Sequence, residues 1–374
     1  MKNSLRFITW PAIAGLLAAL LILDRWVLPN TPTTGGLSQE PVSYAKAVRN
    51  ATPAVVNIYT AKLVTSRRNP LMEDKYFRQF ARPQSQRQRL EQSLGSGVIM
   101  TEHGHILTNN HVIAGADAIQ VLLHDGRSAN AVVVGTDPAT DLAVLQIDLP
   151  DMRPIKLGDS NAARVGDVVL AIGNPLGFGH SVTQGIVSAL GRYGLQRTTY
   201  EDYIQTDATI HLGNSGGALI DTRGRLLGIN TLIYTGNTQA SNTGTGIGIS
   251  LAIPVNLAVF VMQDLIDYGE VIRGWLGVSV EPIGKMPNGE TSSQVLGVVA
   301  VAADSPAQKA GVQLGDIITH IDGEPVRDGR LTMHRIALLR PGDTVAISVQ
   351  RNQQSFELRA VVGVLRQSSG QAAD

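Results

Sequence analysis

Short apolar runs separated by turn residues dominate the chain between residues 55 and 252. They are four to eight residues long and rich in Val, Ile, Leu and Ala. Runs of this kind predict β-strands, and many in succession predict barrels or a sandwich. The predicted strands are Val55–Thr60, Gly97–Met100, His105–Thr108, Ala118–Leu123, Ala131–Val134, Leu142–Ile147, Val168–Ile172, Gly185–Leu190, Leu226–Ile233 and Gly246–Ala252.

Helical spacing interrupts the strand pattern at two places. The segment Val42–Asn50 predicts a short helix that ends before Pro53. Apolar residues recur at helical intervals from Asn256 to Tyr268, and Gly269 is placed to end that helix.

The pattern changes again at Arg273. The rest of the chain predicts a β-rich unit with two helices, followed by a frayed tail at residues 366–374. Its predicted strands are Trp275–Val280, Gly297–Val301, Asp316–Ile321, Val345–Arg351 and Phe356–Val362, and its predicted helices are Pro306–Ala310 and Leu331–Leu339.

The N-terminal segment has the pattern of a membrane anchor. From Phe7 to Leu23 there are 17 residues without a charge. They would span about 25 Å as a helix, so the residues up to 28 are needed to approach a bilayer core. Lys2 and Arg6 precede the run, which favours a cytoplasmic N-terminus. We predict an uncleaved anchor at residues 1–28 and a tether at 29–41. The alternative is a cleaved secretory signal. The lack of a small-x-small cleavage site just after the run argues against it.

Composition narrows the class of protein. A length of 374 residues indicates two or three domains. The 31 basic and 31 acidic residues cancel, which argues against a dedicated nucleic-acid binder. The absence of cysteine excludes disulfides, a thiol nucleophile and thiolate metal sites. The segment Leu63–Gln92 is polar and rich in Arg; it predicts a solvated loop, with contact to an acidic membrane surface as the alternative.

The sharpest chemical signal is Gly213-Asn214-Ser215-Gly216-Gly217. Glycines allow a tight turn on which a serine is exposed and backbone N–H groups can point at a substrate carbonyl. His111 follows one predicted strand and Asp141 precedes another. An imidazole can take the serine proton while a carboxylate holds its useful tautomer. The order His, Asp, Ser is that of chymotrypsin-type enzymes and differs from α/β-hydrolases and subtilisins.

The remaining histidines favour structural or surface roles. His103 and His105 lie at a predicted hairpin without a third metal ligand, and His211, His320 and His334 lack a ligand partner at suitable spacing. The glycines between residues 244 and 248 open no helix, so they are not a dinucleotide-binding motif. We therefore predict no metal and no cofactor.

Three motifs in register, TNNHV, DLAVL and GNSGGAL, resemble the HtrA serine proteases, and GIGISLAIP follows them. The resemblance extends over residues 42–365. It implies a mainly β fold, with a chymotrypsin-like double β-barrel protease domain at 42–270 and a PDZ domain at 273–365. It also implies that Ser215 is the nucleophile, His111 the general base and acid, and Asp141 the orienting carboxylate.

The resemblance extends to the oxyanion hole and the substrate strand. The backbone N–H groups of Gly213 and Ser215 would form the hole, with help from Asn214. The family commonly has Asn-Pro before GNSGG, whereas this chain has His211-Leu212, which leaves the resting geometry of this loop open. The substrate-binding residues would be Leu212, Ile229, Asn230 and Thr231, with cleavage after small or medium apolar residues.

The PDZ resemblance indicates a reader of peptide C-termini. Trp275-Leu276-Gly277-Val278 fits the loop whose backbone N–H groups cradle a terminal carboxylate. Met333, Ile336 and Leu339 on the facing helix would line an apolar pocket, although they can equally be core residues. This predicts hydrophobic C-terminal residues as ligands.

An anchor followed by one PDZ-like domain is most similar to the membrane-tethered DegS/AlgW branch of the family. That resemblance implies a single-pass protein of the bacterial inner membrane whose catalytic and PDZ domains lie in the periplasm. It further implies a homotrimer with contacts near residues 42–56, an anti-sigma factor as substrate in envelope-stress signalling, and relief of inhibition by PDZ peptides through Arg192. The alternatives are a non-catalytic scaffold or chaperone that binds exposed C-termini, and a soluble protease of general degradation.

Overall fold

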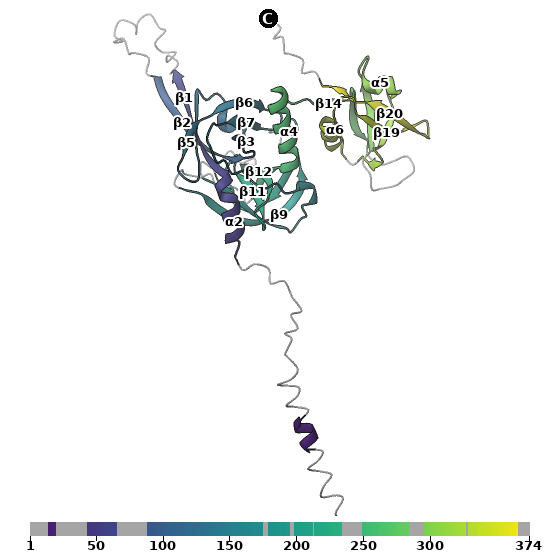
Figure 1. Ribbon diagram of the computed structural model, residues 1–374. Helices are drawn as coiled ribbons and strands as arrows, with labels where there is room; N and C mark the ends of the chain where they lie inside the picture. The colour runs from purple at the N-terminus through teal and green to yellow at the C-terminus, as the bar shows by residue number, and fades with distance from the viewer. Residues whose placement is uncertain are drawn as a thin grey trace, which may run out of the picture. The chain divides into compact units, whose positions relative to one another are not determined.

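The computed structural model describes residues 14–19, 43–65, 88–174, 179–194, 198–211, 213–233, 249–283, 295–326 and 328–365. The chain divides into two compact units, Met1–Tyr44 and Ala45–Asp374 (Figure 1). In the first unit, residues 14–19 are helical. Among the residues described, none of the helices has the length and apolar character required to span a membrane. Most of the predicted anchor and the whole tether at 29–41 lie outside the described residues, as do Leu212 and the tail at 366–374.

The first half of the second unit is a seven-stranded antiparallel sheet in the order β5-β4-β1-β2-β3-β7-β6. Strand β7 (Leu142–Gln146), which lies between β3 and the edge strand β6, is apolar on both faces, because its first four residues are all fully buried. Long pairing between β1 and β2 sets the register, with Val55 opposite Val98. The remaining strands are β1 (Val55–Thr65), β2 (Gln88–Ile99), β3 (His105–Asn109), β4 (Ala118–Leu122), β5 (Ser128–Asn130) and β6 (Val132–Asp137).

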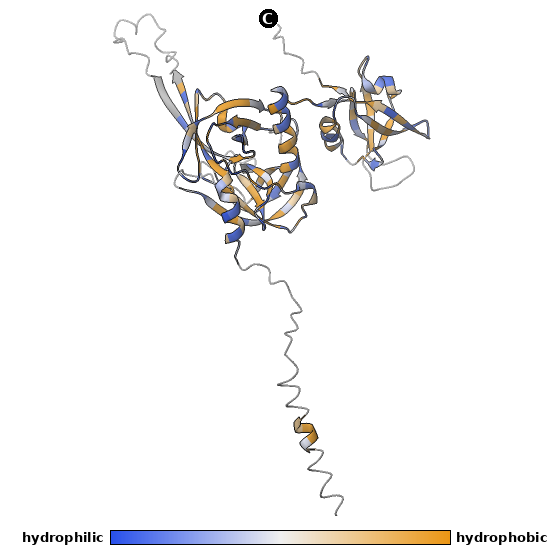
Figure 2. Ribbon diagram, viewed as in Figure 1, coloured by the Kyte–Doolittle hydropathy of each residue, from blue (hydrophilic) through white to orange (hydrophobic). Residues whose placement is uncertain are grey.

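Six further strands form a closed barrel in the order β10-β13-β12-β11-β8-β9. Its interior is a cluster of buried aliphatic side chains that includes Val169, Ile204 and Leu219. Figure 2 shows hydrophobic residues running along these strands. The strands are β8 (Val168–Gly173), β9 (Ser181–Arg192), β10 (Tyr203–Thr206), β11 (Ala218–Asp221), β12 (Leu226–Ile233) and β13 (Ser250–Pro254).

Helix α4 (Val255–Tyr268) follows β13 and confirms the predicted helix. It buries Leu257, Val261 and Leu265, and Gly269 ends it in the left-handed conformation with φ of 77°. The Gly269 N–H donates to the Leu265 carbonyl at 3.1 Å, as a glycine C-cap requires. The short helices are α2 (Ala45–Ala51), η1 (Thr52–Ala54), α3 (Asn110–Ile113) and η3 (Ser160–Ala162).

The C-terminal region contains its own core and two sheets. One sheet has the order β15-β16-β17-β19-β20, with β18 paired to β17, and the other joins β14 to β21. Its core includes Leu296, Ile318 and Val345. The strands are β14 (Gly274–Trp275), β15 (Val278–Ile283), β16 (Val295–Val301), β17 (Ile317–Ile321), β18 (Glu324–Pro325), β19 (Thr344–Arg351), β20 (Gln354–Val361) and β21 (Gly363–Val364), and the helices are α5 (Pro306–Ala310) and α6 (Gly329–Leu338).

Several predicted boundaries are wrong. Both ends of the predicted loop Leu63–Gln92 are strand, because β1 continues to Thr65 and β2 begins at Gln88. These polar ends pair across the β1–β2 ladder, so backbone hydrogen bonding extends the strands where side-chain pattern predicted a loop. The predicted strand Trp275–Val280 is also split, because Gly277 has φ of 78° and interrupts it.

Candidate active site

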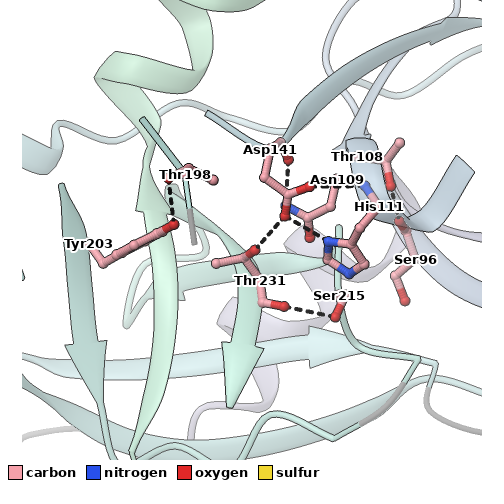
Figure 3. Close-up of polar contacts among 9 residues, drawn as sticks. All are labelled: Ser96, Thr108, Asn109, His111, Asp141, Thr198, Tyr203, Ser215 and Thr231. Carbon is pink, nitrogen blue, oxygen red and sulfur yellow. Dashed lines mark hydrogen bonds and ion pairs between the residues drawn. The ribbon is translucent and has the colours of Figure 1, made fainter. Parts of the chain in front are cut away.

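His111 and Asp141 meet where β3 ends beside the start of β7 in the first sheet. His111 lies on α3, directly after β3, and Asp141 directly precedes β7. The His111 Nδ1–H donates to Asp141 Oδ2 at 2.6 Å, and the His111 backbone N–H donates to Oδ1 at 2.9 Å (Figure 3). One carboxylate therefore holds both the ring and the backbone of His111, which leaves Nε2 as the free ring nitrogen.

The turn at Asp141 is tightly constructed. Asp141 has φ of 59°, a left-handed conformation that is uncommon for a residue other than glycine. Its carbonyl accepts the Asn110 backbone N–H and the Asn109 side-chain amide, each at 3.0 Å. These bonds hold the strained turn and direct the carboxylate toward the imidazole.

Ser215 comes from the closed barrel, on the turn between residues 213 and 217 that leads into β11. Gly213 and Gly216 have φ of 94° and 83°. A Cβ on Gly216 would lie 2.1 Å from the Ser96 carbonyl oxygen, so only glycine fits there. The sequence therefore places its serine on a turn that other residues could not form.

The Ser215 hydroxyl donates to the Thr231 carbonyl at 2.9 Å. Among the described residues no hydrogen bond joins it to His111, although both side chains face the same space in Figure 3. Thr231 also donates from Oγ1 to Asp141 Oδ2 at 3.1 Å, at a point where β12 departs from regular pairing with β13. Thr231 thus contacts both the serine and the carboxylate.

Ser96, a fully buried residue of β2, connects the first sheet to this turn. Its hydroxyl donates to the Gly213 carbonyl at 2.6 Å and accepts the Asn174 N–H at 3.0 Å. Its backbone N–H donates to the Ser215 carbonyl at 2.9 Å. Thr108 Oγ1 in turn donates to the Ser96 carbonyl at 2.7 Å (Figure 3).

The backbone N–H groups of Gly213 and Ser215 donate to no other residue in the described part of the chain. This agrees with the predicted oxyanion hole, which stays a prediction. The Asn214 side chain is fully buried, and the Asn214 backbone N–H donates to the His211 carbonyl at 3.0 Å. This geometry does not favour the predicted help from Asn214.

Part of the predicted substrate-binding strand supports the serine turn instead. Ile229 and Asn230 are fully buried. The Asn230 carbonyl accepts the Gly216 N–H at 2.8 Å, and its side-chain amide donates to the carbonyls of Ile172 and Ala218. These contacts brace the serine turn. Of the four residues predicted to bind substrate, Leu212 lies outside the described residues, and Thr231 lies beside Ser215.

The C-terminal region contains a groove of about 690 Å³ between α6 and the start of β15. All six predicted peptide-binding residues line it: Trp275, Leu276, Gly277, Val278, Met333 and Ile336. Leu276 and Ile336 are buried while Met333 is 45% exposed, so the groove has a buried floor and an open edge. The third predicted helix residue, Leu339, packs instead against the apolar core.

Arg192, the predicted regulatory residue, ends β9 and is exposed. Its Nε–H donates to Gln205 Oε1 at 2.8 Å on the neighbouring strand β10. No acidic side chain pairs with it among the described residues.

In the residues that the structure describes, no group of three or more His, Asp or Glu side chains could hold a metal ion.

Sequence reasoning missed the positions of Ser96, the bond from Thr231 to Asp141, and a contact between His124 and His180. Only the first had a local signal, because Ser96 lies in a Gly-Ser-Gly sequence of a buried strand.

Comparison with known proteins agrees with the geometry. Residues 95–229 match the family "Trypsin-like peptidase domain", and residues 274–362 match "PDZ domain". The chain is 41% identical over 338 residues to "Serine endoprotease DegS" of Escherichia coli (strain K12), with 89% of each chain covered. It is 39% identical to "Probable periplasmic serine endoprotease DegP-like" of Pseudomonas putida (strain W619), with 86% of this chain and 70% of that protein covered.

A solved structure titled "HtrA-type protease AlgW with decapeptide" is 48% identical to this chain. It superposes with a TM-score of 0.67 and covers 87% of this chain and 100% of the other.

Fold and site together define a chymotrypsin-like serine endopeptidase with one PDZ domain. The chain belongs to the HtrA family of serine proteases, and within it to the DegS/AlgW type.

Proposed function

We propose that this chain is a membrane-anchored periplasmic endopeptidase that uses Ser215, His111 and Asp141 to cleave a regulatory or misfolded envelope protein. The proposal rests on the 2.6 Å bond from His111 to Asp141, with Ser215 facing the same imidazole from the closed barrel (Figure 3).

In the reaction, His111 Nε2 takes the hydroxyl proton as Ser215 Oγ attacks the scissile carbonyl. Asp141 holds the imidazole in the required tautomer and stabilises the imidazolium that forms. The oxyanion lies against the N–H groups of Gly213 and Ser215. His111 then donates the proton to the leaving amine. In the second half of the reaction His111 takes a proton from a water that attacks the acyl-enzyme, and it returns this proton to Ser215 Oγ as the ester bond breaks.

The bond from Ser215 to Thr231 means that the hydroxyl must first turn toward His111. This requirement supports a resting state that is poorly poised for attack and a separate step of activation. A ligand can drive such a step only by binding the active arrangement more tightly than the resting one.

We propose that hydrophobic C-terminal peptides provide that ligand by adding as a strand in the groove beside Met333 and Ile336. Contacts between α6 and the protease domain support this gating. The His334 ring packs edge-on against the Tyr200 ring, with centroids 6.3 Å apart. The Tyr200 N–H donates to the Ala139 carbonyl at 3.0 Å, two residues from Asp141. Arg192 is proposed to take part in the same regulation.

Anchoring by residues 1–28, the domain boundaries at 42–270 and 273–365, and an anti-sigma factor as substrate also belong to this proposal. They rest on the uncharged run of residues 7–23 and on the resemblance to the DegS/AlgW branch. A homotrimer is proposed on the same grounds. A row of exposed apolar side chains on β9, Val182, Ile186 and Leu190, offers a surface for contact between copies.

The decisive experiment follows cleavage of an unstructured, apolar-rich protein by the full chain, with Ser215→Ala as the inactive control. It is run with short peptides that end in hydrophobic residues, either with a free carboxylate or amidated. We expect activation by the free-carboxylate peptides alone.

Equal activity in all peptide conditions would retain the protease and overturn the gating. Peptide binding without cleavage, and without labelling of Ser215 by a fluorophosphonate, would favour the non-catalytic scaffold. Anchoring is tested separately by membrane fractionation and by sequencing the mature N-terminus. Recovery of a soluble protein with a shortened N-terminus would favour the cleaved signal.

A further inference from the structure

Two histidines far apart in sequence meet at the junction of the two protease sheets. His124 lies on the turn between β4 and β5 of the first sheet, and His180 directly precedes β9 of the second barrel. Their Nδ1 atoms are 3.3 Å apart, and their ring centroids are 5.1 Å apart. His124 is exposed, so solvent reaches the pair from one side.

The tautomer of His180 follows from its other contact. Its Nε2 lies 2.8 Å from the Val55 carbonyl oxygen, which can only accept, so Nε2 carries the proton. Nδ1 of the neutral ring therefore has a free lone pair that faces His124. Histidines that bind metals typically donate their other ring N–H to a carbonyl in this manner, which fixes the ring orientation.

The charge state suits a ligand as well. Burial lowers the pKa of His180, and neighbouring His124 lowers it further, against the opposing effect of the Val55 carbonyl. A lowered pKa favours the neutral imidazole, which is the form that binds metals.

The separation of the two nitrogens matches a metal chelate. Zinc–nitrogen bonds of about 2.0–2.1 Å in a tetrahedral arrangement place two ligand nitrogens about 3.3–3.4 Å apart. The observed separation of 3.3 Å lies in that range. A plain hydrogen bond between the rings is the competing explanation, and it needs a proton on His124 Nδ1. The exposed His124 ring can instead carry its proton on Nε2.

We propose that His124 and His180 bind one divalent transition-metal ion of the Zn²⁺ class through their Nδ1 atoms, with water completing the coordination. Imidazole ligands suit Zn²⁺, Ni²⁺ and Cu²⁺, whereas Mg²⁺ and Ca²⁺ prefer oxygen.

Such an ion would link the first sheet to the second barrel. A short series of hydrogen bonds would also connect it to the serine turn. The Gly179 N–H, one residue before His180, donates to Asn174 Oδ1 at 3.2 Å, and the Asn174 N–H donates to Ser96, which holds Gly213. Because the ion binds the folded chain, it should raise the unfolding temperature.

The test measures binding of Zn²⁺ and Co²⁺ to the full chain, purified without a histidine tag, by equilibrium dialysis with metal analysis. Co²⁺ absorption and the midpoint of thermal unfolding are followed in parallel. We expect one ion per chain, an intense visible Co²⁺ band and a saturable rise in the midpoint. His124→Ala should weaken binding at least tenfold and abolish the rise, while leaving the midpoint without metal unchanged.

His103→Ala is the matched control, because it removes an exposed histidine from another turn, and it should bind as the unmodified chain does. Absence of saturable binding by the unmodified chain would overturn the proposal and leave the pair as a hydrogen bond. Equal binding by His124→Ala would overturn it too, because the ion would then have other ligands.

Discussion

At the scale of the residue, the site depends on a few side chains that each satisfy two partners. Asp141 binds both the ring and the backbone of His111 while it accepts from Thr231. The Ser96 hydroxyl contacts Gly213 and Asn174, and the Ser96 backbone N–H contacts Ser215. Substitution of such a residue therefore changes geometry at several atoms at once.

Asp141→Asn should lower kcat/KM by about three to four orders of magnitude, because an amide can donate to Nδ1 and so favour the wrong imidazole tautomer. The comparison is steady-state cleavage by the unmodified chain and the variant, with circular dichroism to check that both are folded. A loss below tenfold in the folded variant would contradict the orienting role.

Ser96→Ala removes the hydroxyl that holds the Gly213 carbonyl. We expect a decrease in kcat of about tenfold to a hundredfold, because misplacement of an oxyanion donor by a fraction of an ångström is costly. KM and the affinity for PDZ peptides should change little. Ser128→Ala on the exposed strand β5 is the matched control. A fall in stability with kcat intact would show that Ser96 acts on folding alone.

At the scale of the element, strand ends and helix ends carry the function. Strands β3 and β7 pair directly, and this register places His111 and Asp141, 30 residues apart, within one hydrogen bond. In the C-terminal region, Arg351 at the end of β19 binds the buried Asp316, directly before β17, through two hydrogen bonds of 2.6 and 2.7 Å.

Burial alone would raise the pKa of Asp316, but hydrogen bonds from Arg351 and from the Gln313 N–H outweigh it and lower the pKa. A depressed carboxyl pKa contributes stability that is present above about pH 4 and is lost as the pH falls through the folded value. Arg351→Met should leave the carboxylate buried and unpaired, at a cost of about 3 kcal/mol in the free energy of unfolding.

Urea unfolding at pH 7 and pH 3 measures this effect. The difference between Arg351→Met and the unmodified chain should shrink at pH 3, where the carboxyl is closer to neutral. An equal difference at both pH values would attribute the loss to packing of the arginine against Phe356.

At the scale of the whole molecule, side-chain contacts connect the protease and PDZ regions within the unit Ala45–Asp374. Arg340 binds the buried Asp264 at 2.6 Å and stacks over the Phe260 ring. His334 is buried against Tyr200. Burial lowers the pKa of His334; nearby Asp202 opposes this, and Arg273 adds to it.

The lowered pKa of His334 predicts acid sensitivity of this contact. Below about pH 6.5 the unfolded chain takes up a proton that the folded chain does not. Stability therefore decreases as the pH decreases, until the pH passes the pKa of His334 in the folded chain. The loss is about 1.4 kcal/mol for each unit by which the pKa is lowered. His334→Gln should flatten the dependence of the unfolding free energy between pH 7.5 and 5.5.

His103→Gln, on an exposed turn, is the control and should retain the dependence. An unchanged slope in His334→Gln would assign the acid sensitivity to other groups.

Much of this architecture could be predicted from local pattern. Helix α4 and its Gly269 cap, the succession of strands and the serine turn all depend on near neighbours in the chain. Strand pairings could not be predicted in this way, and β5, β10 and β11 were missed because three or four residues carry too little pattern.

Local sequence therefore specifies which residues can perform acyl transfer and which segments can form strands, because propensity and turn chemistry act over a few residues. Tertiary packing alone decides that Thr231 reaches Asp141 across 90 positions, that Ser96 supports Gly213 across 117, and that His124 meets His180 across 56. Register and barrel closure set those distances, and both are properties of strands that are remote in the chain.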